Sequence, residues 1–220
     1  MRHTSGVGGN IFAAPVSGKR NDIRSLRDFL PLFVNEPLQF EPGSKTEYSN
    51  AGYVVLGLLI ERLSGQNYYS YVKEHIFDPA GMTRTGSFQV DSLPPNTAVG
   101  YTRGLQTEKP AGASVHPNRD DLPGRGSSAG GGYSTAEDLL KFLKALRERR
   151  IANGPPAGLG IAGGSGGINA VVEGELPGGY DLVVLANLDP PAAERVARLT
   201  REWLGVTDEG PGPGQRPSRR

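Results

Sequence analysis

Tyr48 and Asn50 are the two residues whose types and spacing most directly suggest chemistry. Side chains separated by one residue can project together from a turn into a cleft, where a tyrosine hydroxyl can take up a proton and an asparagine amide can hydrogen-bond a substrate. A free tyrosine has a pKa near ~10, so about 0.1% is ionised at neutral pH and a neighbouring cation is needed. The alternative interpretation is structural, with Tyr48 packed in a loop and Asn50 serving as a helix N-cap.

Two other serine patterns in the chain match nucleophile motifs by letters only. Ser70-Tyr71-Val72-Lys73 fits Ser-x-x-Lys, but it follows Tyr48, and one chance match is unremarkable in a chain of this length, so we expect Ser70 to be a surface or packing residue. Ser165 fits Gly-x-Ser-x-Gly, yet that motif needs a following helix and a later histidine, and no histidine follows. Gly158 to Gly163 spells a dinucleotide fingerprint but opens no predicted helix.

Composition excludes several classes of function. The net charge of +1 gives no basic stripe for nucleic acid, and without cysteine there is no disulfide or Cys-ligated zinc. His75 and His116 lack spaced partners, so no metal and no cofactor are predicted. The longest apolar run, Val54 to Ile60, is too short for a membrane span, and the first residues lack the apolar stretch of a signal peptide, which gives a cytoplasmic location as the chain is written.

The helices that must position these residues follow from apolar periodicity. The longest spans Ala51 to Leu63, with Asn50 as N-cap, Gly65 as the stop, and an inward face that includes Leu59 and Leu63. We further predict helices over Arg20 to Phe33, over Asn67 to Phe77 with Asp78-Pro79 closing it, and from a Ser134–Glu137 capping box to Arg147 with Leu139, Leu140, Leu143 and Leu146 facing inward.

The carboxy-terminal half predicts a sheet. Ile168 to Leu176 and Tyr180 to Ala186 are apolar runs split by Pro177-Gly178-Gly179, as in an antiparallel hairpin, and Asp189-Pro190-Pro191 starts a final helix whose Val196, Leu199 and Trp203 are expected to pack on one side. Residues 94 to 125 show little periodicity. The pattern predicts an α+β fold with helices against an antiparallel sheet, in one domain over residues 1–205 with a disordered tail over 206–220.

The segment Phe40 to Tyr53, which contains Tyr48-Ser49-Asn50, resembles the second motif region of the serine β-lactamase and penicillin-binding-protein-like hydrolases, a family that includes class C β-lactamases, esterases and DD-peptidases. Further stretches resemble the same family in the same order: His3-Thr4-Ser5-Gly6, Asp78 to Thr83, Ala129 to Leu139 and Val183 to Asn187. The resemblance extends to about residue 204.

The resemblance implies a role for each matching position. Tyr48 is the catalytic base beside the lysine of Ser-x-x-Lys, and Asn50 contacts the substrate. The third motif falls on Ile161-Ala162-Gly163, where the backbone of Gly163 or Gly164 would supply half of an oxyanion hole. Ile161 lacks the usual polar or cationic group, which favours an esterase or peptidase over recognition of a β-lactam carboxylate.

In the family the nucleophile motif lies several tens of residues ahead of the segment that here starts at His3. We therefore expect a truncated fold without the first strands and the nucleophile helix, inactive alone, and prone to self-association through an exposed apolar edge. The alternatives are a non-catalytic binding or scaffold remnant, and a complete enzyme whose recorded start is wrong. A small-molecule ester or amide is the expected partner, with no nucleic acid and no membrane span.

Overall fold

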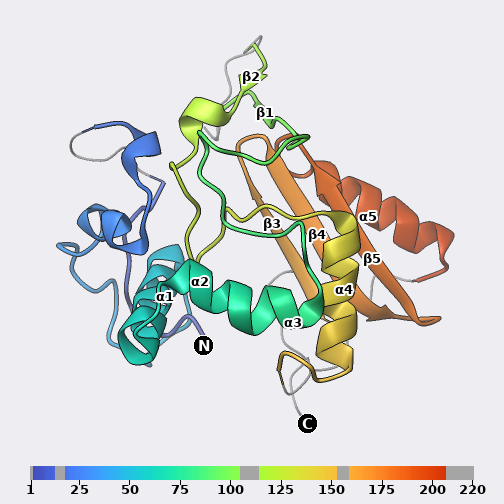
Figure 1. The fold of residues 1–220 in the computed structure, drawn as a ribbon, viewed down its shortest axis with the longest axis horizontal. Coiled ribbons are helices and arrows are strands. Elements are labelled where there is room, and N and C mark those ends of the chain that lie inside the picture. Colours follow the sequence, from blue (N-terminus) through green and yellow to red (C-terminus); the bar gives the residue numbers. More distant parts are fainter. Residues whose placement is uncertain (1, 13–17, 105–113, 153–158, 207–220) are drawn as a thin grey trace. The chain divides into compact units, whose positions relative to one another are not determined.

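The computed structural model describes residues 2–12, 18–104, 114–152 and 159–206 (Figure 1). The chain divides into two compact units. The first comprises Met1–His75, Gly86–Pro95 and Asp120–Tyr133, and the second comprises Ile76–Thr85, Asn96–Arg119 and Ser134–Arg220. The predicted disordered tail lies, from residue 207, outside the described residues, and the single domain over 1–205 stays a prediction.

The first unit begins with two 3-10 segments, η1 (Arg20–Asp22) and η2 (Leu26–Leu32), where the sequence predicted one α-helix. The buried residues Ile23, Leu26 and Phe29 recur every three positions, which suits a helix of three residues per turn. The Asp28 carboxylate accepts the backbone N–H groups of Arg24 and Ser25 and so starts the second segment separately. The prediction of one continuous helix over Arg20 to Phe33 was wrong.

Helix α1 (Asn50–Ser64) packs on this core through Ala51, Val54 and Gly57. Gly65 ends the helix in the left-handed conformation, as predicted. Two details differ from the sequence analysis. Ser49 is the N-cap and Asn50 is already helical. The predicted inward face is also too long, because Leu59 and Leu63 are exposed at the far end of the helix.

A helical stretch follows as α2 (Tyr68–Val72), the π-helical turn η3 (Lys73–Phe77) and α3 (Asp78–Ala80). The Asn67 side chain accepts the Tyr69 N–H at its start. The predicted stop at Asp78-Pro79 was wrong, because the proline occupies the first turn of α3, where a missing N–H costs little. Gly81, at a φ of 74°, ends the stretch instead.

The second unit is built on a three-stranded antiparallel sheet in the order β3 (Gly160–Ser165), β4 (Ile168–Leu176) and β5 (Tyr180–Ala186). The β4 and β5 boundaries are those predicted for the hairpin. The register pairs Val171 with Ala162 and Val184, so alternate side chains of all three strands share a face. The prediction of an α+β fold is confirmed.

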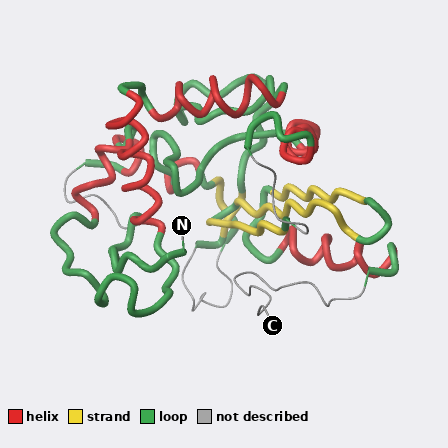
Figure 2. The backbone as a smooth tube through the Cα atoms, turned by 90° about the horizontal axis from the view of Figure 1, so that it is seen from below, coloured by secondary structure: helices red, strands yellow, loops and turns green. Residues whose placement is uncertain are grey.

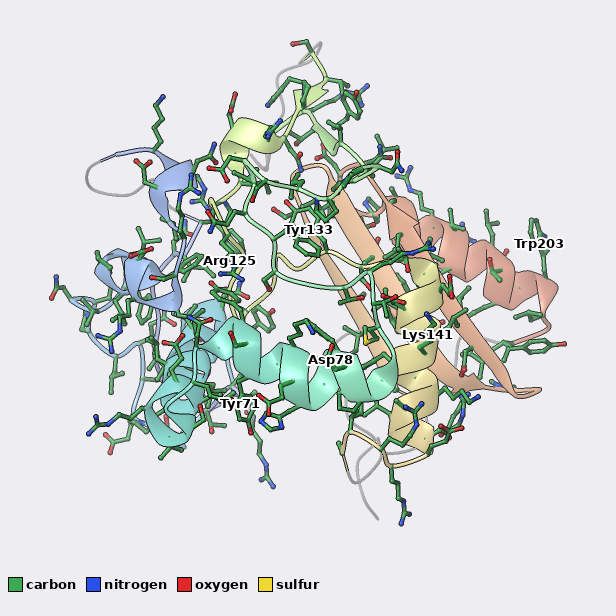
Figure 3. All side chains as sticks on the ribbon, in the orientation of Figure 1. Tyr71, Asp78, Arg125, Tyr133, Lys141 and Trp203 are labelled. Atoms are coloured by element: carbon green, nitrogen blue, oxygen red, sulfur yellow. The ribbon has the colours of Figure 1, made fainter. Side chains whose placement is uncertain are left out.

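Helices α4 (Ala136–Arg147) and α5 (Ala192–Trp203) cover opposite faces of this sheet (Figure 2). On one face Ala193 and Ala197 pack against Val171, and on the other Leu143 lies over Gly174. The predicted packing of Val196, Leu199 and Trp203 was wrong: all three are exposed, and Trp203 projects from the end of α5 (Figure 3). Small alanines, rather than the large residues, let α5 lie close to the sheet.

Helix α4 also differs by one residue from the prediction. Thr135, not Ser134, is the N-cap, and its hydroxyl accepts the Asp138 N–H at 3.1 Å. Leu143 is buried as expected, whereas Leu140 is exposed. The buried polar residue on this helix is Asp138, whose carboxylate accepts hydrogen bonds from the Arg84 backbone at 2.7 Å, from the Thr85 hydroxyl at 2.9 Å and from Lys141 at 3.0 Å.

The segment of low periodicity contains only short elements among its described residues. Strands β1 (Tyr101–Thr102) and β2 (His116–Pro117) pair with each other, and the 3-10 turn η4 spans Arg119–Asp121. Within the described ranges, no helix has both the length and the apolar character that crossing a bilayer requires.

Candidate active site

The first turn of α1 fixes the backbone of the Tyr-x-Asn segment. The hydroxyl of the middle residue, Ser49, accepts the Gly52 N–H at 2.9 Å and so caps the helix. The same hydroxyl donates to the Val7 carbonyl at 2.5 Å. Ser49 therefore joins the helix to a segment 42 residues earlier in the chain. The side chains of Tyr48 and Asn50, on either side of Ser49, do not cap the helix.

Tyr48 and Asn50 lie together as the spacing predicts. The Tyr48 hydroxyl donates to Asn50 Oδ1 at 3.2 Å, and the tyrosine side chain is exposed. This bond engages the carbonyl end of the amide and leaves the two N–H groups of Asn50 Nδ2 available for a ligand. The structural alternative for Asn50 is therefore wrong, because Ser49 and not Asn50 caps the helix.

A cavity of about 270 Å³ lies beside this turn, entirely within the first unit. Its wall is formed by residues 7–12 and 47–50 together with Gln39. Both Tyr48 and Asn50 line it. The cavity volume is just below the range typical of sites that enclose drug-sized ligands.

Residues 3–7 hold the Tyr-x-Asn turn from the other side. Thr4 and Gly6 accept the backbone N–H groups of Gly43 and Gln39, each at 2.8 Å. Gly6 has a φ of 72°, and a Cβ there would lie 2.3 Å from the Phe40 carbonyl oxygen, so only glycine fits. His3 completes the contact, because its carbonyl accepts the Glu47 N–H at 2.9 Å and its Nδ1 accepts the Ser49 N–H at 3.1 Å.

The lysine nearest to Tyr48 in sequence is already engaged. Lys45 forms a salt bridge of 2.7 Å with Glu47, and its ammonium lies 4.9 Å from the centre of the Phe40 ring. The Tyr48 side chain contacts Asn50 and, with ring centres 4.6 Å apart, His3. Lys45 is therefore paired with Glu47, and a tyrosine acting as a base would need a cation from another residue.

Gly163 and Gly164 lie in strand β3 of the second unit. A Cβ on Gly163 would meet open space, whereas one on Gly164 would lie 2.4 Å from Pro190. Ile161, at the third-motif position, is half exposed. β3 is an edge strand among the described strands, with pairing only to β4.

Asn169 anchors this glycine-rich strand. It is buried, its Nδ2 donates to the Gly163 carbonyl and to Glu194, each at 3.0 Å, and its Oδ1 accepts the Ala193 N–H at 2.7 Å. One side chain thus ties β3 to the start of α5. Sequence reasoning missed Asn169, and its only signal was a polar residue at an inward position of an apolar strand.

Ser70 and Ser165, the serines of the two motifs that match by letters only, lie in positions that fit a structural role. Ser70 is exposed on α2, beside the buried Tyr69. Ser165 ends β3, and the chain turns directly into β4 without a helix. Tyr69 is structural: its hydroxyl donates to the Gly126 carbonyl at 2.7 Å, Arg125 stacks on its ring (Figure 3 labels Arg125), and burial raises the pKa of Tyr69 to about 12.

Comparison with known proteins identifies the family. The beta-lactamase family model matches residues 1–187, so the chain belongs to the beta-lactamase family. The relatives are bacterial and mitochondrial. The PbpX protein of Bacillus subtilis (strain 168), which carries the name of a penicillin-binding protein, is 32% identical over 152 residues, 69% of this chain and 35% of its own length. The mitochondrial serine beta-lactamase-like protein LACTB of Mus musculus is 35% identical over 127 residues, 57% of this chain and 21% of its own length.

Solved structures agree. A penicillin-binding protein from Bacillus halodurans has a TM-score of 0.77 at 29% identity, covering 91% of this chain and 70% of that one. A D-amino acid amidase from Ochrobactrum anthropi SV3 has a TM-score of 0.73 at 23% identity, which shows a shared fold, over 93% of this chain and 70% of that one. The chain spans about a third or less of the length of the curated relatives it matches.

Proposed function

We propose that this chain supplies the Tyr-x-Asn part and the β3 edge of a serine acyl hydrolase that acts on a small ester or amide. The observation that carries the proposal is the paired Tyr48 and Asn50 at the wall of a cavity, in a member of the beta-lactamase family. The amidase activity named for one structural neighbour supports amides as a substrate class.

In the proposed reaction a serine Oγ attacks the substrate carbonyl carbon and its proton passes to the ionised Tyr48 oxygen. Tyr48 then returns that proton to the leaving alcohol or amine as the bond to the carbonyl carbon breaks. Water hydrolyses the acyl-enzyme by the same exchange in reverse order. Asn50 Nδ2 donates to the substrate. The donor to the developing oxyanion is assigned, by the order of the motifs alone, to a backbone N–H at Gly163 or Gly164 in the second unit.

The serine and the lysine that keeps Tyr48 ionised are proposed to come from residues beyond these 220, in a longer polypeptide. Loss of a nucleophile costs on the order of 10⁶ in turnover, so the 220-residue chain is expected to be nearly inert. The non-catalytic remnant remains the second candidate, and the observation that favours it is Ile161, an apolar side chain where the third motif carries a polar one.

The first experiment is to read the nucleotide sequence upstream of Met1 for an in-frame Ser-x-x-Lys codon pattern. Its presence supports the hydrolase, and its absence supports the remnant. A fluorophosphonate probe should leave the 220-residue chain unlabelled and should label the extended protein at the new serine. Stoichiometric labelling of Ser70 or Ser165 would refute the assignment.

A second experiment tests Tyr48 in the extended protein. Tyr48→Phe should lower kcat by roughly 10²- to 10⁴-fold, which is the usual contribution of a general acid or base. Tyr71→Phe is the matched control, because the Tyr71 ring contacts His75, with ring centres 4.2 Å apart, and not the motif. Equal losses in both variants would point to a folding defect and not to catalysis.

A further inference from the structure

His3 contacts the Tyr-x-Asn turn through both its ring and its Nδ1 atom. Its ring contacts two tyrosine rings, with centres 4.6 Å from Tyr48 and 5.1 Å from Tyr53, at interplanar angles of 33° and 35°. Its Nδ1 accepts the N–H of Ser49, the residue between the two functional side chains. One imidazole thus contacts both the backbone and the aromatic ring of the motif.

The direction of the hydrogen bond fixes the chemical form of the imidazole. Nδ1 can accept the Ser49 N–H only if it carries no proton, so the ring must be the neutral tautomer with its proton on Nε2. A protonated ring, or the other tautomer, would place an N–H against the Ser49 N–H and push the turn away. The geometry of the motif is therefore coupled to one protonation state of His3.

The backbone of His3 shows that the position is specified. Its φ of 55° lies in the left-handed region, which residues other than glycine, asparagine, aspartate and histidine rarely occupy. In this conformation the His3 carbonyl accepts the Glu47 N–H at 2.9 Å, immediately before Tyr48. Backbone and ring of His3 therefore hold the turn at two places, on either side of the tyrosine.

We infer that His3 is a positioning residue for Tyr48, and that its neutral Nε2–H tautomer sets the orientation of the tyrosine over the cavity. The inference rests on the proposed function for its catalytic consequence, but the geometry it claims can be measured without any activity. His3 touches neither substrate nor reacting atoms in this assignment; it acts through Ser49 and Tyr48.

The first test is the ¹⁵N spectrum of the imidazoles in the 220-residue chain at pH 8, where an ordinary histidine is neutral. Nδ1 of His3 should have the chemical shift of an unprotonated acceptor nitrogen. A protonated Nδ1 would overturn the inference outright, and this measurement needs no variant that might unfold.

The second test separates the acceptor from the ring by hydrogen exchange of the Ser49 amide. His3→Asn keeps an acceptor oxygen at the place of Nδ1 and tolerates the left-handed backbone, so protection of Ser49 should stay within about twofold. His3→Gly also tolerates the backbone but removes the acceptor, so protection should fall roughly 3- to 10-fold. Unchanged protection in His3→Gly would refute the acceptor role.

His75→Asn is the matched control, because the His75 ring also contacts a tyrosine ring, that of Tyr71, but lies on η3 and not on the motif. It should leave the Ser49 amide unchanged, and a loss equal to that of His3→Gly would show a general destabilisation instead. The Tyr48 ring resonances should move in both His3 variants, since both remove the stacked ring, and should stay in place in His75→Asn.

The catalytic consequence is tested in the extended protein. His3→Gly should lower kcat by about 10- to 100-fold with KM within twofold, because a misplaced base slows the chemical step, and His3→Asn should recover part of the loss. An inactive extended protein in which the spectra still show an unprotonated Nδ1 would refute the proposed function alone. Full activity in His3→Gly would refute the positioning role alone.

Discussion

Gly57→Ala should destabilise the first unit even though alanine is the better helix former. Gly57 lies on the buried face of α1, and a Cβ there would sit 2.3 Å from the Ser128 Oγ and 2.6 Å from Leu26 Cδ1. Alanine gains about 1 kcal/mol in helix propensity over glycine. Overpacking costs about 1 to 3 kcal/mol, and displacing Ser128 breaks its hydrogen bond to the Tyr53 carbonyl, which is worth about 1 kcal/mol. The net expectation is a loss of about 1 to 3 kcal/mol.

Urea unfolding of the chain, followed by the near-ultraviolet signal of its tyrosines, measures this loss. The control is a double-mutant cycle with Ser128→Gly, which removes both of the Ser128 atoms that the new methyl group would meet. The double variant should be more stable than the sum of the two single effects by at least 1 kcal/mol. A stabilised Gly57→Ala variant, or additive effects in the cycle, would refute the packing argument.

Three further variants test other contacts, each by urea unfolding. Tyr69→Phe should cost about 1 to 3 kcal/mol by leaving the Gly126 carbonyl unpaired. Because burial raises the pKa of Tyr69 to about 12, above its unfolded value near ~10, the stabilising effect of Tyr69 should be lost as the pH rises from ~10 to about 12. A stability that does not change over this alkaline range would contradict the argument. Asp138→Asn should cost about 1.5 to 3 kcal/mol. Burial opposes the charge, but the Lys141 ammonium and the backbone and hydroxyl donors keep the pKa of Asp138 below its usual value, so its stabilising contribution is present above pH ~4 and lost below it. Equal acid sensitivity of the wild-type chain and the variant would contradict this contribution. Asn169→Ala should cost about 2 to 4 kcal/mol and speed amide exchange at Ala193, whereas unchanged exchange there would remove the anchoring role.

The sequence predicted the elements that depend on local pattern. The hairpin of β4 and β5 was predicted to the residue, because alternating apolar runs and a Pro-Gly-Gly turn specify it without help from distant contacts. The body of α1 and the glycine that ends it were predicted for the same reason. The pairing of Tyr48 with Asn50 also follows from spacing alone.

What the sequence could not predict depends on which partners the side chains meet. A serine and an asparagine are both good N-caps, and only the Val7 carbonyl, 42 residues away, makes Ser49 the cap and frees Asn50. The large apolar residues of α5, Val196, Leu199 and Trp203, predict a packing face. The helix packs through Ala193 and Ala197 instead, because small residues allow a closer approach to the sheet. The hydrogen bonds of His3 to Ser49 and of Asn169 to Ala193 likewise join segments that are distant in sequence.

The hydrogen bond between Ser49 and Val7 bears on when the Tyr-x-Asn turn can form during folding. Closing a loop of 42 residues costs roughly 3 kcal/mol of chain entropy, which one hydrogen bond does not repay. The turn must therefore wait for the apolar core of the first unit to bring the two segments together. A synthetic peptide spanning residues 40–65 would contain the Tyr-x-Asn segment and all of helix α1, and would still lack the contact with Val7 that holds the turn.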